Sequence, residues 1–120
     1  MSAGKLAMVI FEARTAAHIM HLKTRSYAQH MALNGFYDGI IDLVDAYLEA
    51  YQGVYGLIED YPDAEEFENE RDPLKLMNAL RKFLVANRAG CCKNQTELEN
   101  LYDGMIDLVD STRYKLRFLA

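Results

Sequence analysis

Hydrophobic residues recur every three or four positions along nearly the whole chain, and no segment alternates strictly between hydrophobic and polar residues. The first spacing is typical of an amphipathic helix and the second of a half-buried strand, so the pattern predicts an all-α protein. We expect helices at residues 5–23, 26–58, 73–89 and 97–118. The second is long, and together they predict a four-helix bundle in a single domain, residues 1–120.

Polar motifs mark the predicted helix boundaries. Capping boxes, in which a Ser or Thr accepts from a first-turn amide and a Gln or Glu three positions later reaches back, begin the second and fourth helices. They are Ser26-Tyr27-Ala28-Gln29 and Thr96-Glu97-Leu98-Glu99. The third helix has the start signal Asp72-Pro73, and Gly90 is suited to end it.

Two segments in the predicted second and fourth helices are nearly identical. Residues 37–45 read YDGIIDLVD and residues 102–110 read YDGMIDLVD, so eight of nine positions agree. Either a helical hairpin is duplicated, or bundle packing favours the same stripe twice. The repeat does not include His30 and Glu49, whose counterparts 65 positions later are a glutamine and a tyrosine. A site that uses His30 and Glu49 therefore belongs to the first hairpin alone.

Acidic residues are concentrated between the second and third helices. Residues 59–72 hold eight of the 18 carboxylates and one of the 13 basic residues, leaving ten acids and twelve bases elsewhere. The formal net charge is −5, and no basic arm or stripe suits a nucleic acid backbone. We therefore do not expect DNA binding. The acidic segment is either a solvated connection or a docking site for a basic partner.

Cys91 and Cys92 are the only cysteines, and adjacent cysteines rarely form a disulfide because the geometry is strained. We interpret them as reduced thiols in a turn, which argues against a disulfide-stapled secreted scaffold. No apolar run approaches the roughly 18 residues needed to cross a bilayer, and the first residues lead directly into a helical pattern. We expect an intracellular, cytoplasmic protein without a leader or a membrane partner.

The predicted second helix carries a histidine and several carboxylates beside its apolar stripe. At roughly 100° per residue, His30 projects among the apolar residues, and one flank is lined by Asn34, Asp38, Asp45 and Glu49. This flank is either an ordinary solvated face or part of a metal site. Asp45 and Glu49 are one turn apart, but His30 lies about 22 Å from Asp45 along a straight helix. A second subunit packed antiparallel across a two-fold axis would unite the two ends.

An antiparallel hairpin of the first two helices places His18 and His21 opposite the His30 end. The pattern resembles the metal-site motif of the Dps family, the mini-ferritins. That motif has a first-helix histidine, a histidine twelve residues later, an acid four residues after that, an aspartate fifteen residues after the second histidine, and a glutamate four further on. The matching positions here are His18, His30, Asn34, Asp45 and Glu49, with His21 as an alternative first-helix ligand.

The resemblance implies a ferritin-like bundle whose iron-oxidising centre is shared by a homodimer that forms through the first two helices. Iron is the expected metal, and manganese or zinc would suit the same imidazole and carboxylate donors. The chain is also similar to small uncharacterised ferritin-like proteins of tailed phages. It is shorter than Dps proteins and lacks a lysine-rich tail, so neither the family's cage nor its DNA compaction is implied.

Asn34 stands where the Dps motif has an acid. This difference favours a second hypothesis, in which the protein is a non-catalytic helical binding or structural module with a degenerate metal site. Its ligand would then be a protein partner or a small molecule.

Overall fold

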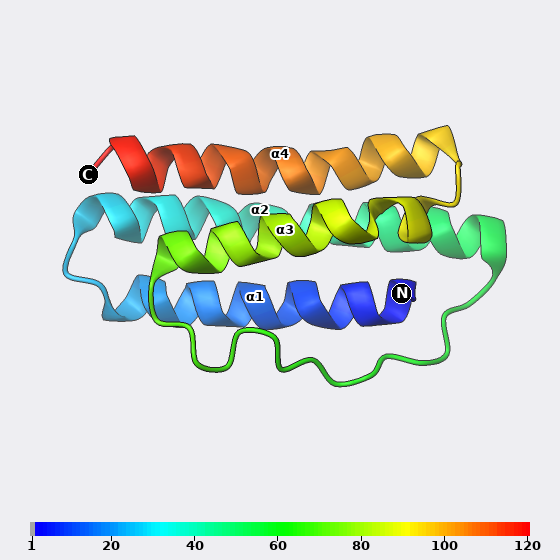
Figure 1. Cartoon of the computed structure of the whole chain (residues 1–120), viewed down its shortest axis with the longest axis horizontal. Coiled ribbons are helices and arrows are strands. Elements are labelled where there is room, and N and C mark those ends of the chain that lie inside the picture. The colour runs from blue at the N-terminus through cyan, green and yellow to red at the C-terminus, as the bar shows by residue number, and fades with distance from the viewer. Residues whose placement is uncertain (1) are drawn as a thin grey trace.

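A computed structural model describes residues 2–120 as four helices without a strand (Figure 1). The helices are α1 (Ala3–Lys23), α2 (Tyr27–Tyr55), α3 (Pro73–Cys92) and α4 (Thr96–Phe118). The predicted all-α four-helix fold is confirmed. Within residues 2–120, no helix is both long enough and apolar enough to span a bilayer.

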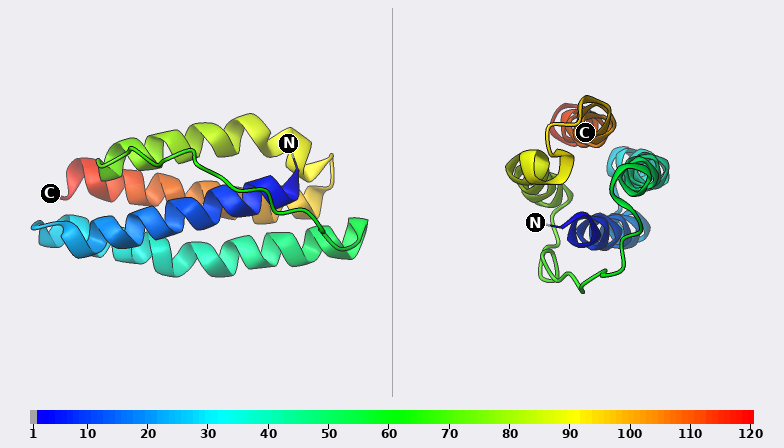
Figure 2. Two further views of the ribbon diagram at one scale, coloured as in Figure 1. Left: turned by 90° about the horizontal axis from the view of Figure 1, so that it is seen from below. Right: turned by 90° about the vertical axis from the view of Figure 1, so that its right-hand side faces the viewer.

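The four helices form two antiparallel hairpins joined by one long crossover. α1 and α2 are joined by a short turn, and so are α3 and α4. Residues 56–72 instead run back along the bundle outside α1, so α3 begins at the same end as α2 (Figures 1 and 2). As a result, α2 packs against α4 and α1 packs against α3.

One of the predicted start signals acts as expected, one acts in part, and one does not. At α2 the Gln29 side chain accepts from the Thr24 hydroxyl, and the Ser26 amide donates to Thr24, so the predicted reach of Gln29 back to Ser26 is absent. The Ser26 hydroxyl accepts from the amide three residues later at 3.2 Å, and Asp72 accepts from an amide in the first turn of α3 at 2.9 Å. At α4 the N-cap is Gln95, whose side chain makes no capping hydrogen bond, so the predicted capping role of Thr96 was wrong. Thr96 is itself the first helical residue.

Two predicted helix ends were also wrong. α2 ends at Tyr55 because Gly56 adopts a φ of 90°, which breaks the helix three residues before the predicted end. α3 continues through Gly90 to Cys92 and is closed by Lys93 in the left-handed conformation. The two cysteines therefore lie in the last helical turn, where their buried side chains pack in the core, and not in a turn between helices.

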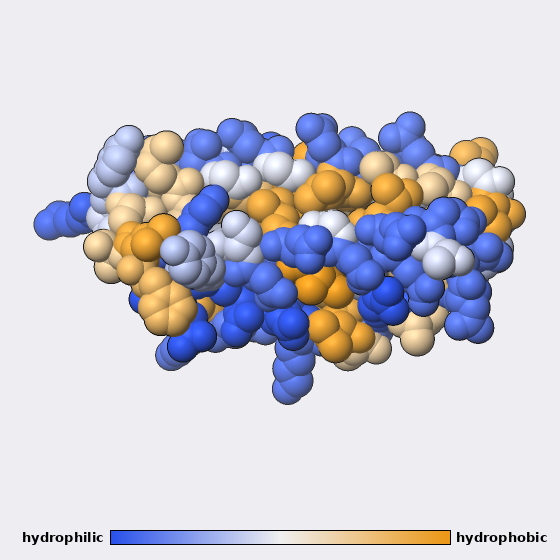
Figure 3. Space-filling model, turned by 90° about the horizontal axis from the view of Figure 1, so that it is seen from above, coloured by the Kyte–Doolittle hydropathy of each residue, from blue (hydrophilic) through white to orange (hydrophobic). Residues whose placement is uncertain are grey.

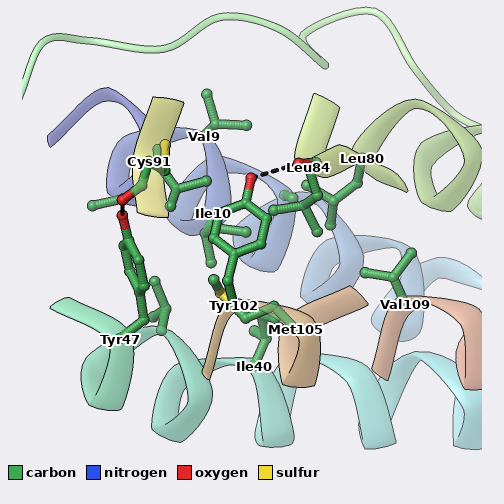
Figure 4. Packing of buried hydrophobic residues seen from close by; sticks show 14 of the residues in the cluster. Val9, Ile10, Ile40, Tyr47, Leu80, Leu84, Cys91, Tyr102, Met105 and Val109 are labelled. Carbon is green, nitrogen blue, oxygen red and sulfur yellow. Dashed lines mark hydrogen bonds between the residues drawn. The ribbon is translucent and has the colours of Figure 1, made fainter. Parts of the chain in front are cut away.

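Tyr47 and Tyr102 are the largest fully buried side chains of the core (Figure 4). Their rings meet edge to face with centroids 5.6 Å apart. The Tyr47 hydroxyl donates to the Cys91 carbonyl at 2.7 Å, and the Tyr102 hydroxyl donates to the Leu84 carbonyl at 2.6 Å. Burial raises the pKa of both phenols. They therefore remain neutral donors that join α2 and α4 to α3.

Most residues of the acidic crossover are exposed, and the crossover is also attached to α1. The Glu12 carboxylate accepts from the amides of Glu66 and Phe67, both at 2.9 Å. Lys5 donates to the Asp63 carbonyl at 3.1 Å, and the Phe67 ring is buried in the core. These contacts fix the path of the middle of the crossover over α1.

Large exposed apolar side chains gather at the end of the bundle where α1 ends, α2 begins and α4 ends. They are Ile19, Leu22, Tyr27, Met31, Tyr114, Phe118 and Leu119. From the side of α4, apolar surface is interspersed with charge along the helix and more continuous toward its C-terminal end (Figure 3). An exposed apolar group of this kind marks a surface suited to binding another molecule.

Candidate metal centre

The three histidines of the chain come together where α1 meets α2. The rings of His21 and His30 stack with centroids 3.7 Å apart and an interplanar angle of 19°. His18 stacks on Tyr37 at 4.1 Å and lies 5.9 Å from His21. His21 is buried, while His18 and His30 are half-buried. The hairpin therefore brings His21 against His30, with His18 on the other side of His21.

Reciprocal hydrogen bonds fix the orientation of two of these rings. His21 Nδ1 lies 2.8 Å from the His30 carbonyl oxygen, and His30 Nδ1 lies 3.0 Å from the His21 carbonyl oxygen. A carbonyl oxygen can only accept, so each Nδ1 carries the proton and donates it. In the neutral rings the lone pair is then on Nε2. Histidines that bind metals are commonly oriented in this way, with the second nitrogen donating to a carbonyl or carboxylate.

A chain of polar side chains continues from His21 along α2. The Tyr37 hydroxyl donates to Asn34 Oδ1 at 2.9 Å and lies 3.4 Å from His21 Nε2. Asn34 Nδ2 donates to the Asp38 carboxylate at 3.2 Å. Because the one hydroxyl proton of Tyr37 is directed to Asn34, the lone pair of neutral His21 remains available to a proton or a metal ion.

Asp45 and Glu49 lie apart from the histidines, on the outward face of α2. Both side chains are exposed, and none of the salt bridges formed within residues 2–120 involves them. In the same part of the chain, no three His, Cys, Asp or Glu side chains are grouped closely enough to hold a metal ion. The chain therefore presents a histidine group and, separately, the carboxylates of Asp45 and Glu49.

Tyr37 and Asp38 are members of this network that the ligand motif does not contain. Their positions relative to Asn34 are i+3 and i+4, which places the three side chains on neighbouring parts of one helix face. This spacing is a sequence signal for the hydrogen bonds. The direction of the Tyr37 ring toward α1 depends on the packing of the two helices.

Two aspartates of α4, Asp103 and Asp110, occupy the positions of the repeat that Asp38 and Asp45 occupy in α2, and both form ion pairs. Arg88 binds Asp103 through two hydrogen bonds of 2.7 and 2.9 Å, and Asp110 lies within salt-bridge distance of Arg81 and Arg113. The Arg88 guanidinium lowers the pKa of Asp103. These aspartates therefore have cationic partners from within the chain, which the carboxylates of α2 lack among residues 2–120.

Comparison with known proteins identifies one family. Neither the curated proteins nor the solved structures contain a match to the chain. Residues 21–116, four fifths of the chain, match a family described as "Family of unknown function (DUF5856)". The matched range contains His21 and the whole of α2 with its candidate ligands, while His18 precedes it. The chain therefore belongs to the DUF5856 family.

Proposed function

We propose that the protein is a ferritin-like, iron-binding bundle that holds Fe(II) between two subunits and promotes its oxidation there. The observation that carries this proposal is the histidine pair of the first hairpin, whose Nδ1 protons are engaged and whose Nε2 atoms suit metal coordination. The single long crossover between α2 and α3 also supports it, because ferritin-like bundles have one such connection.

The proposed ligands come from two subunits whose α2 helices pack antiparallel. His30, with His18 or His21, supplies nitrogen donors from one subunit, and Asp45 and Glu49 supply oxygen donors from the other. Exposed residues of α2 form one stripe suited to this contact: Tyr27, Met31, Asp38, Asp42, Asp45 and Glu49. Mixed imidazole and carboxylate donors suit Fe(II), and also Mn(II) or Zn(II). Fe(II) is the substrate of the proposed reaction, and peroxide or dioxygen accepts its electron.

The negative charge of this stripe affects the stability of the proposed dimer. Two antiparallel stripes bring carboxylates of both subunits together, and like charges at short range oppose association. A divalent cation bound between the stripes offsets that repulsion. Dimerisation through α2 should therefore be strengthened by Fe(II) and weakened by a chelator.

The test is an anaerobic Fe(II) titration of the purified protein, with the molecular mass followed by light scattering. We expect saturable iron binding coupled to dimer formation, then ferric absorbance when peroxide is added. His30→Ala and Glu49→Ala should both abolish binding while the helical circular dichroism is unchanged. Asp107→Ala, which removes an exposed carboxylate of α4, is the matched control and should bind normally. Unchanged iron binding by both ligand variants would refute the site.

Mixing the two inactive variants tests whether the site is shared. In a dimer of one His30→Ala and one Glu49→Ala subunit, one of the two sites has both wild-type residues. Random pairing of equal amounts should therefore restore about a quarter of the wild-type iron binding. A site contained in one chain would show no restoration.

The second candidate function is a non-catalytic helical binding module. It is favoured by the amide of Asn34, which is engaged on both sides by Tyr37 and Asp38 and leaves no carboxylate at this ligand position. This function predicts that the protein ignores Fe(II) and that its mass is independent of metal. The same titration therefore decides between the two functions.

A further inference from the structure

A groove separate from the histidine group lies between the outer face of α1 and the crossover. Its volume is about 870 Å³, and it follows α1 from Met8 to Lys23, which is about 22 Å of helix. The crossover passes outside α1 (Figure 2). Its residues from Asp63 to Arg71 line the opposite side of the groove. The apolar side chains of the floor are Met8, Phe11, Ala16, Ile19 and Met20.

The floor of this groove is an apolar helix face that the bundle does not cover. The opposite face of α1 is packed in the core through Leu6, Val9, Ile10, Ala13 and Ala17. α1 is therefore apolar on both sides, a composition normally found in helices that are buried all round. On the outer side, however, Phe11 is 36% and Ile19 47% exposed. The outer face of α1 is therefore apolar but is not buried by the rest of residues 2–120.

The crossover wall makes the groove acidic. Asp63, Glu65 and Glu68 line it, their residues are exposed, and none of the salt bridges within residues 2–120 uses their carboxylates. Two other carboxylates of the lining, on Glu12 and Glu70, accept from backbone amides of the crossover. The three unpaired carboxylates therefore face an apolar floor across an open groove.

The two basic residues that line the groove, Lys23 and Arg71, do not neutralise the acidic wall. Arg71 donates to backbone carbonyls of the crossover, and Lys23 lies at the far end of α1. The groove therefore combines an apolar floor with a wall whose net charge is negative.

We propose that this groove binds a basic amphipathic helix of a protein partner. The apolar face of that helix would cover Phe11 and Ile19, and its Lys or Arg side chains would meet Asp63, Glu65 and Glu68. A helix of about 14 residues is about 21 Å long and fits the length of the groove. Met8 and Met20 can adapt to different apolar side chains. This inference goes beyond the proposed function and does not depend on metal.

Both the negative charge of the crossover wall and its hydrogen bonds to α1 favour a basic amphipathic helix as the ligand. An anionic membrane surface would be repelled by the acidic wall, whereas a cationic helix is attracted to it. The hydrogen bonds of Glu12 hold the wall in place before a ligand arrives. A wall that is already positioned lowers the ordering cost of binding.

The probe is a fluorescein-labelled helical peptide of about 14 residues, built from leucine on one face and lysine on the other, with binding followed by anisotropy. The intact protein should bind it saturably, and a peptide with glutamate in place of lysine should not bind. Ile19→Ser should weaken binding at least about tenfold because it removes exposed apolar floor. Glu65→Gln/Glu68→Gln should weaken it about threefold to tenfold, and less at high salt.

A charge-matched control separates the groove from general acidity. Glu59→Gln/Asp107→Asn removes two exposed carboxylates that do not line the groove and should leave affinity unchanged. All variants should retain the wild-type circular dichroism. Equal binding by the groove and control variants would overturn the proposal, as would equal binding of the two peptides. A loss of self-association in Ile19→Ser without a change in peptide affinity would assign the groove to a second copy of the chain and would also overturn it.

Discussion

Residues 37–45 and 102–110 share eight of nine amino acids, yet the two segments have different surroundings. They pack against each other on antiparallel helices, in a reciprocal contact. A Cβ on Gly39 would lie 3.2 Å from Leu108, and a Cβ on Gly104 would lie 3.6 Å from Leu43. Where the two segments face each other, the shared sequence thus forms the same glycine and leucine contact twice.

The segments differ where each one faces its hairpin partner. α3 supplies Arg88 to Asp103 and a buried carbonyl to Tyr102, whereas α1 supplies histidines to the half-buried Tyr37. The repeat begins ten residues after the first residue of α2 but six residues after that of α4. The two copies are therefore shifted by about one helical turn, so that matching residues lie at different heights along the helices they pack against, α1 and α3. The partner helix therefore determines which copy becomes core and which carries polar chemistry.

The largest expected difference concerns the two tyrosines. Tyr102→Ala removes a fully buried ring and should lower the free energy of unfolding by about 3–5 kcal/mol. Tyr37→Ala removes a half-buried ring and should lower it by about 1–2 kcal/mol. Urea unfolding followed by circular dichroism measures both values. Equal losses would show that the two copies of the repeat are energetically equivalent.

The helical fold follows from the hydrophobic spacing, because apolar residues at i, i+3 and i+4 specify helices before any tertiary contact is known. The end of α3 could not be predicted from Gly90 because burial of Cys91 and Cys92 extends the helix past that residue. Likewise, the attachment of the crossover depends on Glu12, which is distant from it in sequence. Local signals thus fail where a long-range contact outweighs them.

The candidate site could be predicted in part. The spacing of His18, His21 and His30 was enough to place all three at one end of the first hairpin, because that follows from a short turn between antiparallel helices. The direction of Tyr37 was not predictable, since it depends on the register of α1 against α2. The pairing of Asp45 and Glu49 with a second subunit remains a prediction, because it depends on a surface outside one chain.

A smaller effect tests the reciprocal glycine contact. Alanine replaces glycine in a helix with a gain of about 1 kcal/mol when there is room for the methyl group. Gly104→Ala meets Leu43 at an ordinary contact distance and should raise the free energy of unfolding by about that amount. Gly39→Ala meets Leu108 more tightly and should gain less, or lose stability if the leucine cannot move.

A second substitution identifies the cause of that difference. If crowding by Leu108 limits Gly39→Ala, then adding Leu108→Ala should make the two changes interact favourably in a double-mutant cycle. Adding Leu43→Ala to Gly104→Ala should give little interaction energy. Equal gains for the two single glycine substitutions would mean that the repeat packs symmetrically in solution and that the difference in Cβ distance has no energetic effect.

The smallest expected effect is the contribution of the Arg88 and Asp103 contact, which is near the surface and partly screened. Arg88 lowers the pKa of Asp103 in the folded chain, so at acid pH the unfolded chain binds more protons than the folded one. The stabilisation is therefore complete above roughly pH 4 and is lost as the pH falls through the lowered pKa.

Thermal unfolding from about pH 6 to about pH 2 tests this effect. At the upper end of the range the Tm of the wild type should be higher than that of Asp103→Asn, and the difference should shrink as the pH falls. Asp107→Asn, which removes an exposed carboxylate on the same helix, should keep a nearly constant offset from wild type. A gap for Asp103→Asn that is equally constant would mean that the arginine contact contributes nothing to stability in solution.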